Sequence, residues 1–230
     1  MLKIGDVISY IEMCKIEGVN LQRGMNFHLR GGLSVILMSL RAGAPYNDRI
    51  ENEGRILIYE GHDVSKNYLN ANPKSVDQPM SSPKGRLTQN GLFFEAVKKH
   101  KDNQGDDEFV KVYEKIHSGI WTYNGLFRLL DAWQEDSNKR KVFKFQLELV
   151  EDNNSIDFNS KEVDRNRIIP SSVKLEVWKR DKGKCVKCES IDNLHFDHII
   201  PYSLGGSSLT VENIQLLCAR HNIEKRDKIE

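Results

Sequence analysis

Four cysteine and histidine residues near the C-terminus constrain the fold of this chain more than any other feature. They form two pairs with the same internal spacing, Cys185 with Cys188 and Cys218 with His221. Thiolates and imidazoles in two such pairs are the ligands of a tetrahedral structural zinc site. Buried thiols without metal are the alternative, but the long preceding sequence contains only one cysteine, Cys14. We therefore predict one zinc ion bound by the four residues.

A second group of polar residues lies between and just after the zinc pairs. Asp197 and His198 occur in the string LHFDHIIP, Asn213 follows, and Asn222 comes directly after the last predicted zinc ligand. An isolated Asp-His pair is common on protein surfaces, but its place inside a zinc knuckle favours catalysis. His195 lies on the same face of the predicted strand as Asp197. It could assist a metal ion, contact phosphate, or be a structural histidine.

The runs DHIIPYSLGG and ENIQLLCARHNIEK resemble the HNH nucleases, whose ββα-metal site is a two-stranded hairpin and a helix around one divalent ion. The resemblance covers about residues 170–228. It implies that Asp197 and Asn222 bind a catalytic Mg²⁺ or Mn²⁺ ion. It also implies that His198 is the general base and that Asn213 orients it.

Two further residues of this region need separate comment. Lys225 follows the Asn222 position and, with His195, is a candidate for an assisting role. The fourth zinc position in HNH nucleases is usually cysteine, whereas this chain has His221. Histidine is an accepted zinc ligand, so the prediction of a zinc knuckle stands.

The first two thirds of the chain contain mostly strand-like segments. Apolar runs and alternation predict strands at 33–40, 55–59, 108–116, 125–133 and 141–150, and 3.6-residue spacing predicts helices at 4–16 and 91–101. Residues 151–169 are polar and lack periodicity, which is typical of a linker. A further helix begins at Ser171–Ser172. We expect an α+β protein with domains at 1–150 and 170–230.

Three motifs in the first domain, YNDRIENEGRILIYEGHD, LTQNGLFFEAV and WTYNGLFRLLDAWQ, resemble the SRA family. The resemblance spans about residues 18–150, and Tyr123-Asn124-Gly125 stands where the family has Tyr-Asp-Gly. It implies a PUA-like curved β-barrel with flanking helices that flips a modified cytosine out of duplex DNA. The alternative is a generic β-rich domain in which Tyr46 and Tyr59 only pack the core.

A flipped base loses its stacking and pairing, which the protein must replace. Tyr46 and Tyr59 suit stacking, and Asp48 could accept a hydrogen bond from the cytosine amino group. The family has its acid three residues after the first tyrosine, where this chain has Arg49, so the pocket acid is assigned to Asp48 instead. The strand bearing Ser34 and the loop 42–45 are expected to line the pocket.

Composition excludes some classes and leaves others open. The longest apolar run, from Leu33 to Leu40, is too short to cross a membrane, and the N-terminus has no signal-peptide profile. We expect a cytoplasmic protein in a reducing compartment, without a membrane partner. A net charge of +1 neither supports nor excludes binding to nucleic acid.

Together these patterns predict a type IV-like, modification-dependent restriction endonuclease. It would recognise 5-methyl- or 5-hydroxymethylcytosine in double-stranded DNA and hydrolyse phosphodiester bonds. One alternative is a modified-DNA-binding protein with an inactive HNH module, and another is a sequence-specific nicking endonuclease. Because one HNH site cuts one strand, a double-strand break would need two protomers or two visits, and we expect a homodimer.

Overall fold

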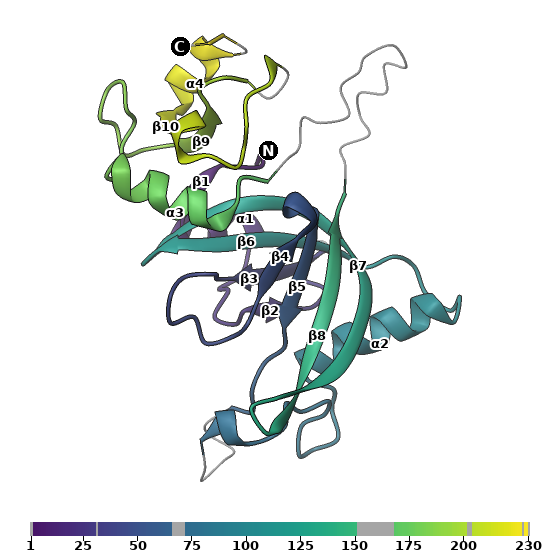
Figure 1. The fold of residues 1–230 in the computed structure, drawn as a ribbon. Coiled ribbons are helices and arrows are strands. Elements are labelled where there is room, and N and C mark those ends of the chain that lie inside the picture. The colour runs from purple at the N-terminus through teal and green to yellow at the C-terminus, as the bar shows by residue number, and fades with distance from the viewer. Residues whose placement is uncertain are drawn as a thin grey trace.

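The computed structural model describes residues 2–30, 32–65, 72–150, 168–201, 204–226 and 228–229. It shows one large curved sheet with helices around it and a small two-stranded sheet near the C-terminus (Figure 1). The predicted α+β class is confirmed. Within these described ranges, no helix is both long and apolar enough to cross a membrane.

The large sheet follows the order β2-β3-β6-β7-β8-β5-β4, and β1 pairs with β7 beside this path. Only the β3–β6 pair is parallel among these neighbours, and the other pairs are antiparallel. The strands are β1 (Val7–Ser9), β2 (Met25–Asn26), β3 (Ser34–Met38), β4 (Arg49–Glu51), β5 (Ile56–Glu60), β6 (Phe109–His117), β7 (Ile120–Ser137) and β8 (Arg140–Leu149). All five predicted strand segments are present.

Strands β7 and β8 form the long hairpin that curves through the centre of the sheet (Figure 1). Asn138 and Lys139 form its two-residue turn, and both have positive φ, as a type I′ turn requires. Register shifts after Val112 and Leu129 mark bulges, which bend a sheet and increase its twist. Gly125, with φ +114°, lies where a Cβ would come within 2.9 Å of Leu149, so this position requires glycine.

The helix α2 (Gln89–Lys101) covers one part of the large sheet. Thr88 caps its first turn, since the side-chain oxygen accepts a hydrogen bond from the Gly91 amide. Phe93 and Val97 are buried one turn apart, and the Phe93 ring meets Phe145 of β8 edge to face. The predicted helix at 91–101 is therefore confirmed with two more residues at its start.

The predicted helix over residues 4–16 is wrong in its first half. Residues 7–9 form strand β1, and only Tyr10–Glu17 form helix α1. Ser9 and Glu12 make a reciprocal capping box that starts the helix there. Ile11, which the spacing placed on the apolar face, is 67% exposed. Pairing with β7 satisfies the backbone of the preceding segment and overrides its helical spacing.

The predicted linker is tested only at its C-terminal end. Residues 151–167 lie outside the described residues, but Ile168 and Ile169 are buried. Ile168 belongs to the core of the large sheet, and its Cβ lies 2.9 Å from where a Cβ on Gly54 would be. The last two residues of the segment assigned to the linker are therefore packed against the protein.

The C-terminal unit combines helices α3 (Ser171–Arg180) and α4 (Ala219–Lys225), the 3₁₀ turn η6 (Val211–Asn213), and strands β9 (Leu194–His198) and β10 (Ile214–Cys218). Strands β9 and β10 pair antiparallel, with Ile214 opposite His198 and Cys218 opposite Leu194. Figure 1 shows this unit stacked on the large sheet, with the N-terminus beside it. Its apolar core includes Val7 and Ile116 from the first domain.

The buried position of Ile168 gives a stability prediction. Ile168→Ala should lower the free energy of unfolding by about 2–5 kcal/mol, because it removes buried methyl groups and leaves a cavity. Urea denaturation measures the change, with Ile11→Ala on the exposed face of α1 as the matched control. If both substitutions cost less than about 0.5 kcal/mol, Ile168 is not part of the core.

Candidate HNH site and base-binding cavity

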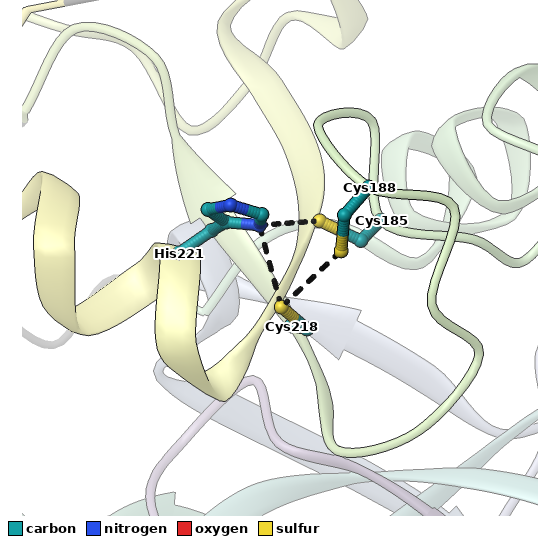
Figure 2. A group of neighbouring side chains, drawn as sticks. All are labelled: Cys185, Cys188, Cys218 and His221. Atoms are coloured by element: carbon teal, nitrogen blue, oxygen red, sulfur yellow. Dashed lines mark hydrogen bonds between the residues drawn. The ribbon is translucent and has the colours of Figure 1, made fainter.

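The four predicted zinc ligands converge in the structure (Figure 2). Cys185 and Cys188 lie in the loop after α3, Cys218 ends β10, and His221 is in the first turn of α4. Their ligand atoms all lie within 4.8 Å of one another, and among the described residues this is the one group of three or more His, Cys, Asp or Glu side chains placed to bind metal.

The distances between these atoms fit a tetrahedral zinc ion. His221 Nδ1 lies 3.3 Å from Cys185 Sγ and 3.4 Å from Cys218 Sγ, and the Cys188 and Cys218 sulfurs are 3.8 Å apart. Bonds of about 2.3 Å to sulfur and about 2.0 Å to nitrogen place tetrahedral ligands about 3.8 Å (S–S) and about 3.6 Å (S–N) apart. Burial raises the pKa of Cys185, but backbone N–H donors, first that of Cys218, lower it to about 6. The residues present therefore fit zinc.

The predicted catalytic residues Asp197 and His198 lie at the end of β9, where Lys225 of α4 contacts both. Lys225 Nζ lies 3.0 Å from Asp197 Oδ2 and donates a hydrogen bond of 2.6 Å to the His198 carbonyl. Lys225 is almost completely buried, at 1% exposure, so the ammonium group is held against β9. This contact fixes the strand that carries Asp197 and His198 to the helix that carries Asn222.

His198 has a partner that the sequence did not predict. Its Nε2 lies 2.8 Å from the hydroxyl of Ser208, a buried residue in the loop between β9 and β10. Burial, followed by the Lys225 charge, lowers the pKa of His198, although the Asp197 charge opposes this. The imidazole is therefore mainly neutral at pH 7 and has Nδ1 left to take a proton.

Asn213 binds the loop between β9 and β10 rather than the imidazole. Its Oδ1 accepts a hydrogen bond from the Ile200 amide, and its Nδ2 donates to the carbonyls of Ile200 and Ser207. The loop held in this way brings Ser208 to His198. The structure therefore gives Asn213 an indirect path to His198, through Ser208.

The donor set beside His198 suits a hard divalent cation. Asp197 Oδ2 is buried and accepts no hydrogen bond, since Lys225 approaches it without hydrogen-bond geometry. Asn222 is partly exposed on α4, the helix that Lys225 joins to β9. Carboxylate and amide oxygens are the ligands that Mg²⁺ and Mn²⁺ prefer. By their chemistry, Asp197 and Asn222 fit the predicted ion.

His195 is placed away from these residues. Its Nδ1 lies 2.6 Å from Asp6 Oδ1, and the backbones of the two residues form an isolated β-bridge. Of the alternatives that the sequence left open, this geometry favours the structural histidine. No motif in the sequence indicated that a residue near the N-terminus would contact the C-terminal unit.

The first domain contains a cavity of about 710 Å³. The three predicted base-contacting residues, Tyr46, Asp48 and Tyr59, all line it. The loop 42–45 lines it as expected, and so does the strand bearing Ser34, through Leu37 and Met38. The hydroxyl of Ser34 itself donates a hydrogen bond to the buried Glu108. Three cationic residues that the sequence analysis did not single out also line the cavity: Arg23, Arg41 and Lys115.

Asp48 lines the cavity and directly precedes β4, which pairs with β5. Its carboxylate accepts hydrogen bonds from the amides of Ser39 (3.3 Å) and Glu60 (3.0 Å). Burial of the carboxyl group nevertheless raises its pKa to about 7. A carboxyl held by two backbone amides is rigidly oriented, which suits recognition of a base edge.

The two tyrosines differ in their surroundings. Tyr59 is buried in the sheet core, with its hydroxyl 3.3 Å from His62 Nε2, so it packs the core as well as lining the cavity. Tyr46 stacks on His62 with ring centroids 5.6 Å apart, and Lys74 Nζ lies 4.1 Å from its ring centroid. Burial lowers the pKa of His62 to about 4, so this imidazole is neutral.

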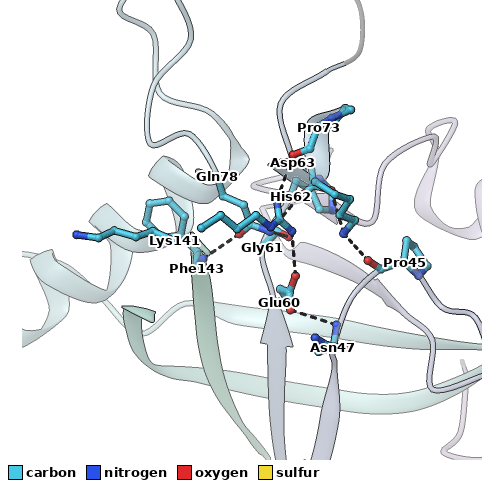
Figure 3. Close-up of polar contacts among 12 residues, drawn as sticks. Pro45, Asn47, Glu60, Gly61, His62, Asp63, Pro73, Gln78, Lys141 and Phe143 are labelled. Atoms are coloured by element: carbon cyan, nitrogen blue, oxygen red, sulfur yellow. Dashed lines mark hydrogen bonds and ion pairs between the residues drawn. The ribbon is translucent and has the colours of Figure 1, made fainter. Parts of the chain in front are cut away.

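A network of polar contacts lies next to the residues that line the cavity (Figure 3). Glu60 accepts a hydrogen bond from the Asn47 amide and pairs with Lys144 at 3.0 Å. Gln78 donates to the Gly61 carbonyl and accepts from the Phe143 amide, which joins the chain after β5 to β8. The network holds the backbone on which Tyr46 and Asp48 are placed.

The ligand cluster leads to a prediction about metal content. Purified protein should contain about one zinc ion per chain, because four protein ligands bind zinc tightly enough to contribute to folding. Elemental analysis tests this. Cys218→Ser should lose the ion, whereas Cys14→Ser, which is outside the cluster, should retain it. Folded wild-type protein without zinc would contradict the assignment.

Comparison with known proteins adds independent information. Residues 184–230 match the family model described as HNH endonuclease. No curated protein matches the chain.

Solved structures with a similar fold include the SUVH5 SRA domain in complex with methylated CHH DNA, which has 22% identity, covers 65% of this chain and 89% of that chain, and has a TM-score of 0.45. A second match is the modification-dependent restriction endonuclease TagI, with 20% identity and a TM-score of 0.42. The match covers 97% of this chain and 77% of the TagI chain. The match to the HNH endonuclease family model over residues 184–230 agrees with the resemblance that the sequence motifs indicated.

Proposed function

We propose that the chain is a modification-dependent restriction endonuclease, with a base reader in residues 1–150 and an HNH nuclease in residues 170–230. The observation that carries the proposal is the match of residues 184–230 to the HNH endonuclease family, together with the placement of Asp197 and His198 against α4. The base-reading part rests on the resemblance to SRA domains and on the cavity that Tyr46, Asp48 and Tyr59 share.

The nuclease residues have distinct roles in hydrolysis. Neutral His198 takes a proton from a water molecule at Nδ1, while Ser208 fixes the ring through Nε2. The water oxygen forms a bond to phosphorus as the bond to the departing 3′ oxygen breaks, which leaves a 5′-phosphate. Asp197 and Asn222 would hold Mg²⁺ or Mn²⁺, which stabilises negative charge on the phosphate and the leaving oxygen. Zinc in the knuckle has four protein ligands and no open position for this role.

The reader residues replace what a flipped cytosine loses. Tyr46 supplies an aromatic wall of the cavity, and Asp48 accepts a hydrogen bond from the cytosine amino group. Arg23, Arg41 and Lys115 line the same cavity and would contact the phosphates that flank the flipped nucleotide. The proposed substrate is double-stranded DNA with 5-methyl- or 5-hydroxymethylcytosine. A double-strand break then needs two protomers or two successive visits by one, and of these we propose a homodimer.

Removal of the general base should separate cleavage from binding. His198→Ala should reduce the single-turnover cleavage rate by at least about 10²-fold, the usual contribution of a general base. It should leave binding of modified DNA unchanged, because His198 is not part of the cavity. Wild-type cleavage should require added Mg²⁺ or Mn²⁺. Normal cleavage by His198→Ala would contradict the catalytic role.

The lowered pKa of His198 predicts how the cleavage rate depends on pH. Because burial and the Lys225 charge lower the pKa of His198, the neutral form is populated from alkaline pH down to below about 6.5. The cleavage rate at saturating Mg²⁺ should change little between pH 8 and 7 and should fall to half only below about pH 6.5, the ordinary pKa of histidine. A rate that already falls between pH 8 and 7 would indicate a base with a raised pKa.

The aromatic wall gives a test of specificity. Tyr46→Ala should remove most of the difference in affinity between matched modified and unmodified duplexes, since stacking on an aromatic side chain is worth about 1–3 kcal/mol per base. Tyr46→Phe keeps the ring and should retain the difference. Fluorescence anisotropy with labelled duplexes measures both. Equal loss in the two variants would assign the effect to the hydroxyl group instead.

A further inference from the structure

The segment Gly5–Asp6 hydrogen-bonds to both domains at once. The Gly5 amide donates to the Tyr123 carbonyl, and the Tyr123 amide donates to the Asp6 carbonyl, both on the side of β7. On the other side, the Phe196 amide of β9 donates to the Gly5 carbonyl, and Asp6 contacts His195. The small sheet of the nuclease is thus joined to the large sheet through the N-terminal segment.

A buried polar contact joins the same two domains at α3. Lys174, with 1% exposure, places Nζ at 2.9 Å from Glu114 Oε2 of β6 and 2.7 Å from Asn124 Oδ1 of β7. Asn124 in turn donates a hydrogen bond to Glu114, at 3.0 Å. Each of the three side chains therefore has hydrogen-bond partners within the group. Glu114 and Asn124 are as deeply buried as Lys174. Such a group tolerates one geometry only, because a displaced partner would leave a buried charge unpaired.

Apolar residues surround this polar contact. One cluster combines residues of the first domain with residues of the nuclease, and Ile168 is inserted in the core of the large sheet. The shared cluster contains Val7, Ile116, Ile169, Val173, Val177, Cys185, Leu194, Phe196, Ile214, Leu216, Leu217 and Cys218. The nuclease therefore buries its core against the reader, which a domain held only by a tether would not do.

We infer that this contact, through Lys174, Glu114 and Asn124, fixes the nuclease on the reader and sets the distance between the modified base and the cut. The inference rests on the proposed function for its consequence at DNA, but the docking itself does not. Residues 151–167 then connect the domains without determining the distance. Lys174 acts as a positioning residue, since it contacts neither the cavity nor the Asp197 and His198 site.

The docking is tested without nuclease activity. A specific protease site inserted within residues 151–167 allows the full chain to be cut after folding, and the two fragments should elute together in size-exclusion chromatography. Lys174→Met leaves Glu114 buried without a cation and should weaken the association by on the order of 100-fold. Lys179→Met, at an exposed position of the same helix, should have no effect.

A rescue variant guards against general misfolding. Lys174→Met combined with Glu114→Gln removes the unpaired charge and should recover part of the lost association. Separation of the wild-type fragments, or an equal effect of Lys174→Met and Lys179→Met, would overturn the inference.

The consequence for cleavage is tested by lengthening the connection. An insertion of six residues, alternating glycine and serine, within residues 151–167 should leave the cut position unchanged on a duplex with a single modified cytosine. A shifted or broadened cut position would show that the linker sets the distance, which would overturn the inference. Absence of cleavage by the wild type would instead count against the proposed function, and the fragment experiment would still decide the docking.

Discussion

The metal cluster of Cys185, Cys188, Cys218 and His221 is the constraint on which the nuclease half depends. A unit of this length buries too little apolar surface to be stable alone. Small domains commonly gain the missing stability by binding a structural metal ion. The cluster joins the loop after α3 to the end of β10 and the start of α4. Lys225, one turn after His221, then joins α4 to β9 through its contact with the Asp197 carboxylate.

Helix α4 carries residues of both the zinc cluster and the predicted catalytic group. His221 and Asn222 are neighbours in sequence but lie about 100° apart around the helix, so the two side chains point in different directions. Lys225 contacts the Asp197 carboxylate and the His198 carbonyl together. This buried ammonium group therefore ties the strand of the candidate site to the helix.

The sequence predicted residues whose role depends on spacing and type. The cysteine and histidine pairs and the strands of the large sheet follow from such local patterns. The shared cavity of Tyr46, Asp48 and Tyr59 follows instead from the resemblance to the SRA family. The sequence could not predict contacts between distant segments. Ser208 reaches His198 only because Asn213 holds the intervening loop, and no spacing rule indicates this.

The contacts between the domains were missed for the same reason. Lys174 belongs to no motif in the sequence, and Asn124 stands out only as the residue at the place of the SRA family's Asp. Their meeting across the interface depends on how β6, β7 and α3 pack together. The polar stretch before residue 168 suggested two independent domains, but Ile168 and Ile169 are apolar and buried. A change from polar to apolar at the end of that stretch was the available signal.

The proposed function requires that cleavage depend on a modified cytosine bound by the same chain. Single-turnover cleavage of two duplexes of identical sequence tests this, one with 5-methyl- or 5-hydroxymethylcytosine and one with unmodified cytosine, in the presence of Mg²⁺ or Mn²⁺. We expect efficient cleavage of the modified duplex and little cleavage of the unmodified one. Equal cleavage of both would contradict it and would indicate a nuclease that reads ordinary bases. Tight binding of modified DNA without cleavage would indicate a reader with an inactive nuclease domain.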